Sequence, residues 1–152
     1  MEYDYPMVVE KLEHIQAPIG YSWGCVNHLM GVKNSPELRE AHEKMQPLVV
    51  KMNQRIGQSQ ALFKALKAIQ TRESVWRKLD GAQKRIVDSS IRTMEASGVG
   101  LGDTSRAAFN KLQLEAAELS SKFSNNVLDS TKAFKLRLTS SSDVEGLPES
   151  AK

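Results

Sequence analysis

Apolar residues recur every three or four positions along this chain, and no stretch alternates apolar and polar residues as a half-buried strand would. The longest run is Phe109, Leu112, Ala116, Leu119, Phe123 and Val127. Only five prolines and nine glycines interrupt the pattern. We therefore predict an all-α fold, an antiparallel helical bundle of five to seven helices. One long C-terminal helix is expected over about 104–138, capped by Asp103 or Thr104.

Three helix starts can be placed from capping residues. Ser35 followed by Pro36 predicts an N-cap and a first helical position. Ser59 is expected to open the next helix, and Asp80 with Gln83 has the form of a capping box. The apolar positions of these last two helices predict the core: Leu62, Phe63, Leu66, Ile69, Ile86, Val87, Ile91 and Met94.

Prolines and glycines predict where helices end. Pro18 should break or kink the first helix, with a second helix from about 19 to 32. Pro47 predicts a kink near Glu43 to Pro47, or two shorter helices that meet there. Gly57 and Gly98 are expected to close their helices. We divide the chain into a helical N-terminal domain over 1–139 and a loose C-terminal tail over 140–152.

The three histidines do not have the spacing of a metal site. His14, His28 and His42 include no pair four residues apart, which would place two imidazoles on one helix face. His42-Glu43 begins like the HExxH zinc motif, but Gln46 stands where the second histidine would be needed. We interpret His42 as an ordinary helix-surface histidine and predict no metal ligand in this chain.

The single cysteine, Cys25, excludes an internal disulfide and fits a reducing compartment. It lies between Gly24 and Val26 in an apolar stretch, three residues before His28. A buried, inert thiol is favoured over a catalytic Cys-His dyad, because no third group orients the pair. The carboxylates lie among basic residues at helical spacing, as on a solvated face. We predict no catalytic and no cofactor-binding residue.

The charge pattern bears on possible partners. The net charge is only +3, and the most basic window is 64–92, which we interpret as a solvated face rather than a site for an acidic partner. We expect no binding to nucleic acid and none to membranes, since no apolar run approaches about 20 residues. Phe134, Leu136 and Leu138 continue the apolar pattern beyond what a small bundle can cover. Their exposure would mark an interface, for example in a dimer.

Two long stretches carry a resemblance to a known family. They are GVKNSPELREAHEKMQPLVVKMNQRIGQS at 31–59 and FNKLQLEAAELSSKFSNNVLDSTKAFKLRLTSSSDVEGLPESAK at 109–152. The most specific words within them are SPELR at 35–39, RIGQS at 55–59, KFSNNVLD at 122–129 and GLPESA at 146–151. In this order they resemble the N-terminal helical domain of the oligopeptidase A and thimet oligopeptidase family of zinc metallopeptidases, nearest its plant and bacterial branch.

The resemblance implies a role without chemistry in this chain. In that family the N-terminal helices form one wall of a deep channel that admits short peptides, and the zinc-binding HExxH helix comes later in the polypeptide. The resemblance therefore implies a chain truncated before the zinc motif, inactive by itself, with a catalytic domain or short peptides as partners. The alternative is a stand-alone helical module that binds proteins or peptides. The implied location is cytoplasmic, or plastid or mitochondrial if a transit peptide was removed.

Overall fold

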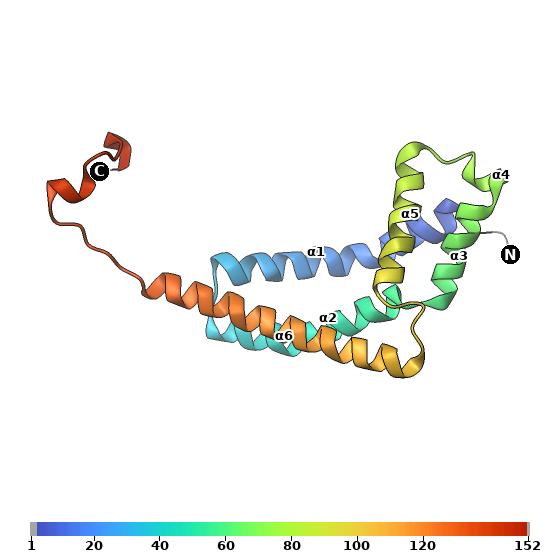
Figure 1. Cartoon of the computed structure of the whole chain (residues 1–152), viewed down its shortest axis with the longest axis horizontal. Helices are drawn as coiled ribbons and strands as arrows, with labels where there is room; N and C mark the ends of the chain where they lie inside the picture. The colour runs from blue at the N-terminus through green and yellow to red at the C-terminus, as the bar shows by residue number, and fades with distance from the viewer. Residues whose placement is uncertain (1–2, 152) are drawn as a thin grey trace. The chain divides into compact units, whose positions relative to one another are not determined.

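A computed structural model describes residues 3–151, which form helices and no strand (Figure 1). Met1, Glu2 and Lys152, at the outer ends of the predicted domain and tail, lie outside the described residues. The all-α prediction is confirmed, and the six α-helices of the described chain fall within the predicted number. In chain order the elements are η1 (Pro6–Glu10), α1 (Lys11–Val32), α2 (Pro36–Gly57), α3 (Gln60–Thr71), α4 (Glu73–Trp76), α5 (Gly81–Ala96), α6 (Asp103–Ala133), η2 (Ser141–Val144) and η3 (Glu149–Ala151).

The chain divides into two compact units. The first extends to Leu119 and contains η1, α1 to α5 and the beginning of α6. The second starts at Ser120 and contains the remaining turns of α6, an irregular segment, and the short 3-10 helices η2 and η3. The pocket, the buried histidine and the interhelical contacts described below all belong to the first unit.

The predicted capping residues begin their helices as expected. The hydroxyls of Ser35 and Ser59 each accept a hydrogen bond from the backbone N–H three residues further on, at 3.2 and 3.3 Å. Asp80 and Gln83 form the complete capping box. The Gln83 backbone N–H donates to the Asp80 carboxylate (2.8 Å), and the Asp80 backbone N–H donates to the Gln83 side chain (3.1 Å). These contacts satisfy N–H groups that the helices leave unpaired at their first turns.

At both prolines the prediction that the helix breaks is wrong. Pro18 does not break a helix, because it lies inside α1, which continues to Val32. Pro47 lies inside α2, so the alternative of two shorter helices meeting there is also wrong. An internal proline costs a helix about 3 kcal/mol through one lost hydrogen bond and one clash. The remaining backbone hydrogen bonds on both sides of each proline offset that local cost.

The long C-terminal helix differs from its prediction at both ends. α6 starts with Asp103 as its first residue rather than its cap, so Thr104 is not the cap either. The Asp103 carboxylate lies 3.2 Å from the Arg106 guanidinium one turn later. The helix ends at Ala133 instead of near Leu138. The apolar residues that follow therefore lie outside any helix.

The buried core is built by η1, α3, α5 and the turn after α5. Ile69 of α3 and Val87 of α5 have no exposed surface. Each such side chain stabilises the fold by about 1.5–3 kcal/mol through burial alone. Of the predicted core positions, Ile86 is wrong because its side chain is exposed, whereas Leu62 and Phe63 are partly buried and pack against the core. The full set of buried apolar residues is Tyr5, Val8, Val9, Ala65, Leu66, Ile69, Leu79, Val87, Ile91, Met94 and Val99.

The other long helices contribute little to this core. α1 and α6 have no buried residue among those described, and the buried residue of α2 is a histidine. The apolar stripe predicted along the last helix is therefore not a core stripe, since Leu112 and Leu119 are exposed. Helical periodicity identified an apolar face, but it could not show whether this chain covers that face.

Gly98 makes the turn between α5 and α6 possible. Its φ is +85°, in the left-handed region that side-chain-bearing residues rarely adopt. A Cβ added at Gly98 would also lie 2.7 Å from Cδ1 of Leu101. The next residue, Val99, is buried in the core. The turn therefore connects the core to the start of α6 through a conformation that only glycine adopts without strain.

We predict that Gly98→Ala lowers the free energy of unfolding by at least ~1–2 kcal/mol, because alanine is strained in left-handed backbone and meets Leu101 here. Urea denaturation followed by circular dichroism measures the change. Gly81→Ala is the matched control, since Gly81 has nothing within 4 Å of its added Cβ and no left-handed backbone. Equal stability of the two variants would contradict this explanation of the turn.

Candidate interaction surfaces

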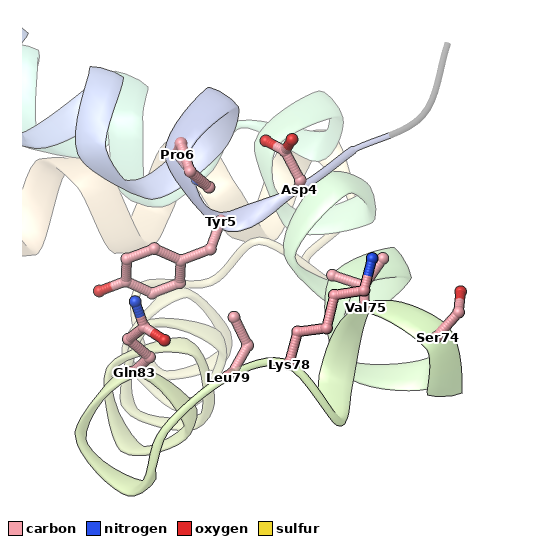
Figure 2. Close-up of a pocket in the computed structure, with 8 residues that line it drawn as sticks. All are labelled: Asp4, Tyr5, Pro6, Ser74, Val75, Lys78, Leu79 and Gln83. Carbon is pink, nitrogen blue, oxygen red and sulfur yellow. The ribbon is translucent and has the colours of Figure 1, made fainter.

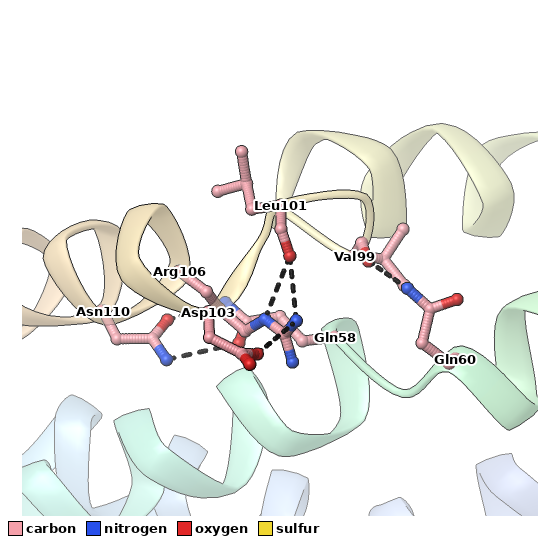
Figure 3. Close-up of polar contacts among 7 residues, drawn as sticks. All are labelled: Gln58, Gln60, Val99, Leu101, Asp103, Arg106 and Asn110. Carbon is pink, nitrogen blue, oxygen red and sulfur yellow. Dashed lines mark hydrogen bonds and ion pairs between the residues drawn. The ribbon is translucent and has the colours of Figure 1, made fainter.

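Side-chain amides join the end of α2 to α6. Gln58 and Asn110 exchange two hydrogen bonds through their amide groups, at 2.6 and 3.2 Å (Figure 3). Two glutamines within α2, which ends just before Gln58, donate to backbone carbonyls of α6: Gln46 to Ala117 (3.2 Å) and Gln54 to Asn110 (3.1 Å). Long polar side chains at spaced positions along α2 thus hold α6 in register.

A second group of polar contacts fixes the turn that leads into α6. The Gln60 amide donates to the carbonyl of Val99, and the Arg106 guanidinium donates to the carbonyl of Leu101 at 2.8 Å (Figure 3). Arg106 also pairs with Asp103 at 3.2 Å. The guanidinium therefore connects the turn to the first turn of the helix. Together these contacts satisfy carbonyls that the irregular backbone leaves without helical partners.

Large apolar side chains lie exposed on the surfaces of the long helices. In the first unit they include Ile15 and Tyr21 of α1 and Leu48 of α2. Among the described residues, no helix combines the length and the apolar character that crossing a membrane requires. Exposed apolar residues gathered on a surface usually mark a site of protein contact.

The second unit carries an apolar group of its own. Phe134, Leu136 and Leu138 follow the end of α6 and are exposed, as the sequence indicated for an interface. Phe123 and Val127 of the last turns of α6 are exposed as well. These residues offer apolar contact area that the described part of the second unit does not cover.

A surface pocket lies where the N-terminal segment meets α4 and the start of α5 (Figure 2). It has a volume of about 450 Å³ and places the Asp4 carboxylate and the Lys78 ammonium in one hollow, with Tyr5 and Leu79 in its wall. Oδ1 of Asp4 already accepts the Met7 backbone N–H at 2.8 Å. Burial, and then the nearby carboxylates of Glu13, Glu10 and Asp80, raise the pKa of the Tyr5 hydroxyl. Among the described residues that line this pocket, no hydrogen bond joins the Ser74 or Tyr5 hydroxyl to Asp4 or Lys78, so these residues do not form a nucleophile paired with a base.

His42 is buried between α1 and α2, so its interpretation as a helix-surface histidine is wrong. Its side chain is 6% exposed, and its ring stacks on Trp23 with centroids 4.8 Å apart. Nε2 lies 3.2 Å from Oδ1 of Asn27, a geometry in which the imidazole donates. Nδ1 has no hydrogen-bond partner among the described residues. Burial lowers the pKa of His42, against a smaller opposing effect of Glu43.

The remaining candidate residues do not come together. His14 bonds through Nδ1 to the carbonyl of Glu10, the last residue of η1 (2.7 Å), and His28 is exposed. Cys25 is exposed, so the prediction of a buried thiol is wrong. Within residues 3–151, no three histidine, cysteine, aspartate or glutamate side chains gather closely enough to hold a metal ion. These residues thus do not supply a metal-ligand set.

Several basic side chains of the window 64–92 contact nearby carboxylates and aromatic rings. Lys67 pairs with Glu95 at 3.7 Å and lies 5.7 Å from the ring centre of Phe63. Arg77 pairs with Glu73 one turn away, and the Lys84 ammonium lies 5.8 Å from the Trp76 ring. These basic side chains lie among carboxylates and aromatic rings, which fits a solvated protein face.

Comparison of the sequence with known proteins gives matches to one family. The family model for the N-terminal domain of neurolysin and thimet oligopeptidase matches residues 1–106. The chain is 45% identical over 152 residues to the probable cytosolic oligopeptidase A of Arabidopsis thaliana, covering 99% of this chain and 21% of the relative. It is equally identical to the organellar (chloroplastic/mitochondrial) oligopeptidase A of that plant, covering 99% of this chain and 19% of that relative.

A bacterial relative gives the same picture. The chain is 34% identical over 149 residues to oligopeptidase A of Escherichia coli strain K12, covering 98% of this chain and 22% of the relative. The chain spans about a fifth of the length of the curated relatives that it matches.

The amide contacts between α2 and α6 predict a stability effect. Asn110→Ala should lower the free energy of unfolding by about 1–2 kcal/mol, because it leaves the half-buried Gln58 amide with one partner fewer. Chemical denaturation measures the loss. Asn126→Ala serves as the control, because Asn126 is exposed on the same helix. If both variants unfold alike, the amide pair does not stabilise the contact.

His42 predicts a pH dependence. Because its pKa is lowered by folding, the folded chain binds fewer protons than the unfolded chain. The stability that neutral His42 contributes is complete above its ordinary pKa of about 6.5 and is lost as the pH falls toward the folded value. Unfolding curves at pH 7.5 and pH 5 should therefore differ less for His42→Phe, which keeps a ring on Trp23, than for the natural chain.

The matched control for this pH effect is His28→Phe at an exposed histidine of α1. Its pH dependence of unfolding is the reference with which that of His42→Phe is compared. An undiminished pH dependence in His42→Phe would show that other groups cause it.

Proposed function

The chain belongs to the neurolysin/thimet oligopeptidase family, as its N-terminal domain, and from this premise we propose that it forms a non-catalytic wall of the channel through which an oligopeptidase admits short peptides. In this role it limits the size of the substrate and takes no part in bond cleavage. The proposal extends the family assignment to a mechanical role.

The composition of the candidate sites supports a non-catalytic role. The family consists of zinc metallopeptidases, yet the residues of this chain do not fit a zinc site. After His42-Glu43, Gln46 stands where an HExxH motif would need its second histidine. His42 itself is enclosed by Trp23 and Asn27 instead of facing a cavity. Instead of metal ligands, the chain has exposed surfaces on long helices, and amide contacts hold two of these helices together.

The surface of the long helices supports the role of a wall. Helices hold a wall's shape because most of their backbone groups are paired internally, and the Gln58–Asn110 pair fixes the end of α2 against α6. The exposed side chains of these helices include apolar groups, such as Leu48 and Leu112, among charged ones, and the apolar groups can contact peptides or protein. A rigid wall excludes large substrates by geometry, so it needs no reactive group of its own.

The names of the relatives bear on location. The two Arabidopsis relatives are described as cytosolic and as chloroplastic/mitochondrial. We propose that this chain acts in one of these compartments. Its single cysteine fits a reducing environment.

A second candidate function is a stand-alone module that binds proteins or peptides. One observation favours it: Phe134, Leu136 and Leu138 form an exposed apolar group in the second unit. Such a group could bind a partner without any catalytic domain. If this second function is correct, the chain is not needed for the peptidase activity of a full-length oligopeptidase.

We predict that the 152-residue chain alone does not cleave a fluorogenic short peptide, with or without added zinc. A chimera in which the chain replaces the aligned fifth of Arabidopsis cytosolic oligopeptidase A should cleave that peptide. It should leave a large unfolded protein substrate intact, because the reconstituted wall excludes it. The natural Arabidopsis enzyme is the reference for both measurements.

Zinc-dependent cleavage by the isolated chain would contradict the non-catalytic role. A folded chimera without peptidase activity would contradict the wall function and would favour the interaction module.

A further inference from the structure

The helix α1 lacks charge over nearly its whole length. Residues 14–32 contain no lysine, arginine, aspartate or glutamate, whereas 26% of the whole chain is charged. At that frequency a solvated segment of this length would carry about five charges. A helix that is apolar or uncharged on every side is typical of an element covered on more than one side.

The structure covers α1 on one side. Trp23 stacks on His42 of α2, and Asn27 lies at hydrogen-bond distance from the same histidine. On the rest of its circumference, the side chains of Ile15, Tyr21 and Val32 are 73%, 79% and 67% exposed. We name these exposed residues, with Leu29, the outer face of α1. It is an apolar surface that the described residues leave open.

Three glycines add an independent observation. Gly20, Gly24 and Gly31 are helical residues of α1, and a Cβ added to any of them would meet nothing within 4 Å. Glycine destabilises an exposed helix interior relative to alanine. Nothing within the described residues requires glycine at these positions. Glycine is useful in a helix when another backbone approaches closely, so these positions fit a second packing partner.

The length of the relatives indicates which partner covers this face. The chain aligns over 99% of its length with a relative of which it makes up 21%, so most of that polypeptide lies outside the aligned part. An uncharged surface with glycines suits a permanent contact, because permanent interfaces resemble a domain core cut in half. A transient partner of opposite charge would find no charged residue to pair with over 14–32.

We propose that the outer face of α1 docks on an apolar surface of the remaining part of an oligopeptidase polypeptide. This proposal rests on the wall function, for which it names the docking surface. Docking would cover α1 on a second side, as its uncharged sequence predicts. The glycines would then allow the partner's backbone to approach α1 closely.

Cys25 is a built-in probe of this contact. Its thiol is exposed and lies four residues after Tyr21, so both project from the same part of the helix. The rate at which N-ethylmaleimide alkylates Cys25, measured by mass spectrometry of its peptide, reports whether the face is open. We expect the rate to be about tenfold or more lower in the chimera with Arabidopsis cytosolic oligopeptidase A than in the isolated chain. Equal rates would overturn the proposal.

A charge placed on this side of the helix should restore access. Gly24→Glu in the chimera is expected to raise the alkylation rate toward that of the isolated Gly24→Glu chain, which corrects for any change in thiol reactivity. Gly81→Glu is the matched control, since Gly81 also has open space around it but lies on α5. Continued protection of Cys25 in Gly24→Glu would overturn the proposal. So would concentration-dependent protection in the isolated chain, which would assign the face to a second copy.

The glycines allow a second readout. Gly20→Ala and Gly24→Ala should each raise the Tm of the isolated chain by about 2–4 °C, because alanine is the better helix former and meets no neighbour here. In the chimera the same changes should lower protection of Cys25. Unchanged protection would exclude close backbone approach and overturn that part of the proposal. Loss of peptidase activity with Cys25 still protected would instead reject the wall function alone.

Discussion

The small core formed by η1, α3 and α5 is the constraint on which the rest of the structure depends. Ile69 and Val87 are fully enclosed there, and the buried Val99 extends the core to the turn before α6. No other part of the described chain encloses apolar side chains to this degree. Because α1, α2 and α6 contribute so little to this core, they keep surfaces that are free to contact other molecules.

Local chemistry was predictable from sequence where it depends on residues a few positions apart. Ser35, Ser59 and the Asp80–Gln83 pair begin their helices as expected, because a cap needs only the first turn that follows it. Pro18 misled the prediction for the opposite reason. Its local cost is real, but it is outweighed by the hydrogen bonds of a helix that extends well beyond it on both sides.

Burial within α1 and α2 could not be predicted, because it depends on which helix covers which side. Residues 14–32 of α1 carry no charged side chain on any side, so the sequence does not reveal which side meets α2. The sequence predicted a buried Cys25 and a surface-exposed His42, but Cys25 is exposed and His42 is buried against Trp23. The family resemblance was recognisable from ordered sequence words, whereas the amide pairing of Gln58 with Asn110 depends on distant contacts that no local pattern encodes.

Hydrogen–deuterium exchange of α1 tests the central claim most directly, because it compares one helix in two settings. In the isolated chain, the amides of α1 should exchange faster than those of α3 and α5, which contain the core. In the chimera with the plant oligopeptidase, the α1 amides should become protected while those of α3 and α5 change little. Equal protection of α1 in both settings would contradict the account, since it would show that this helix needs no further partner.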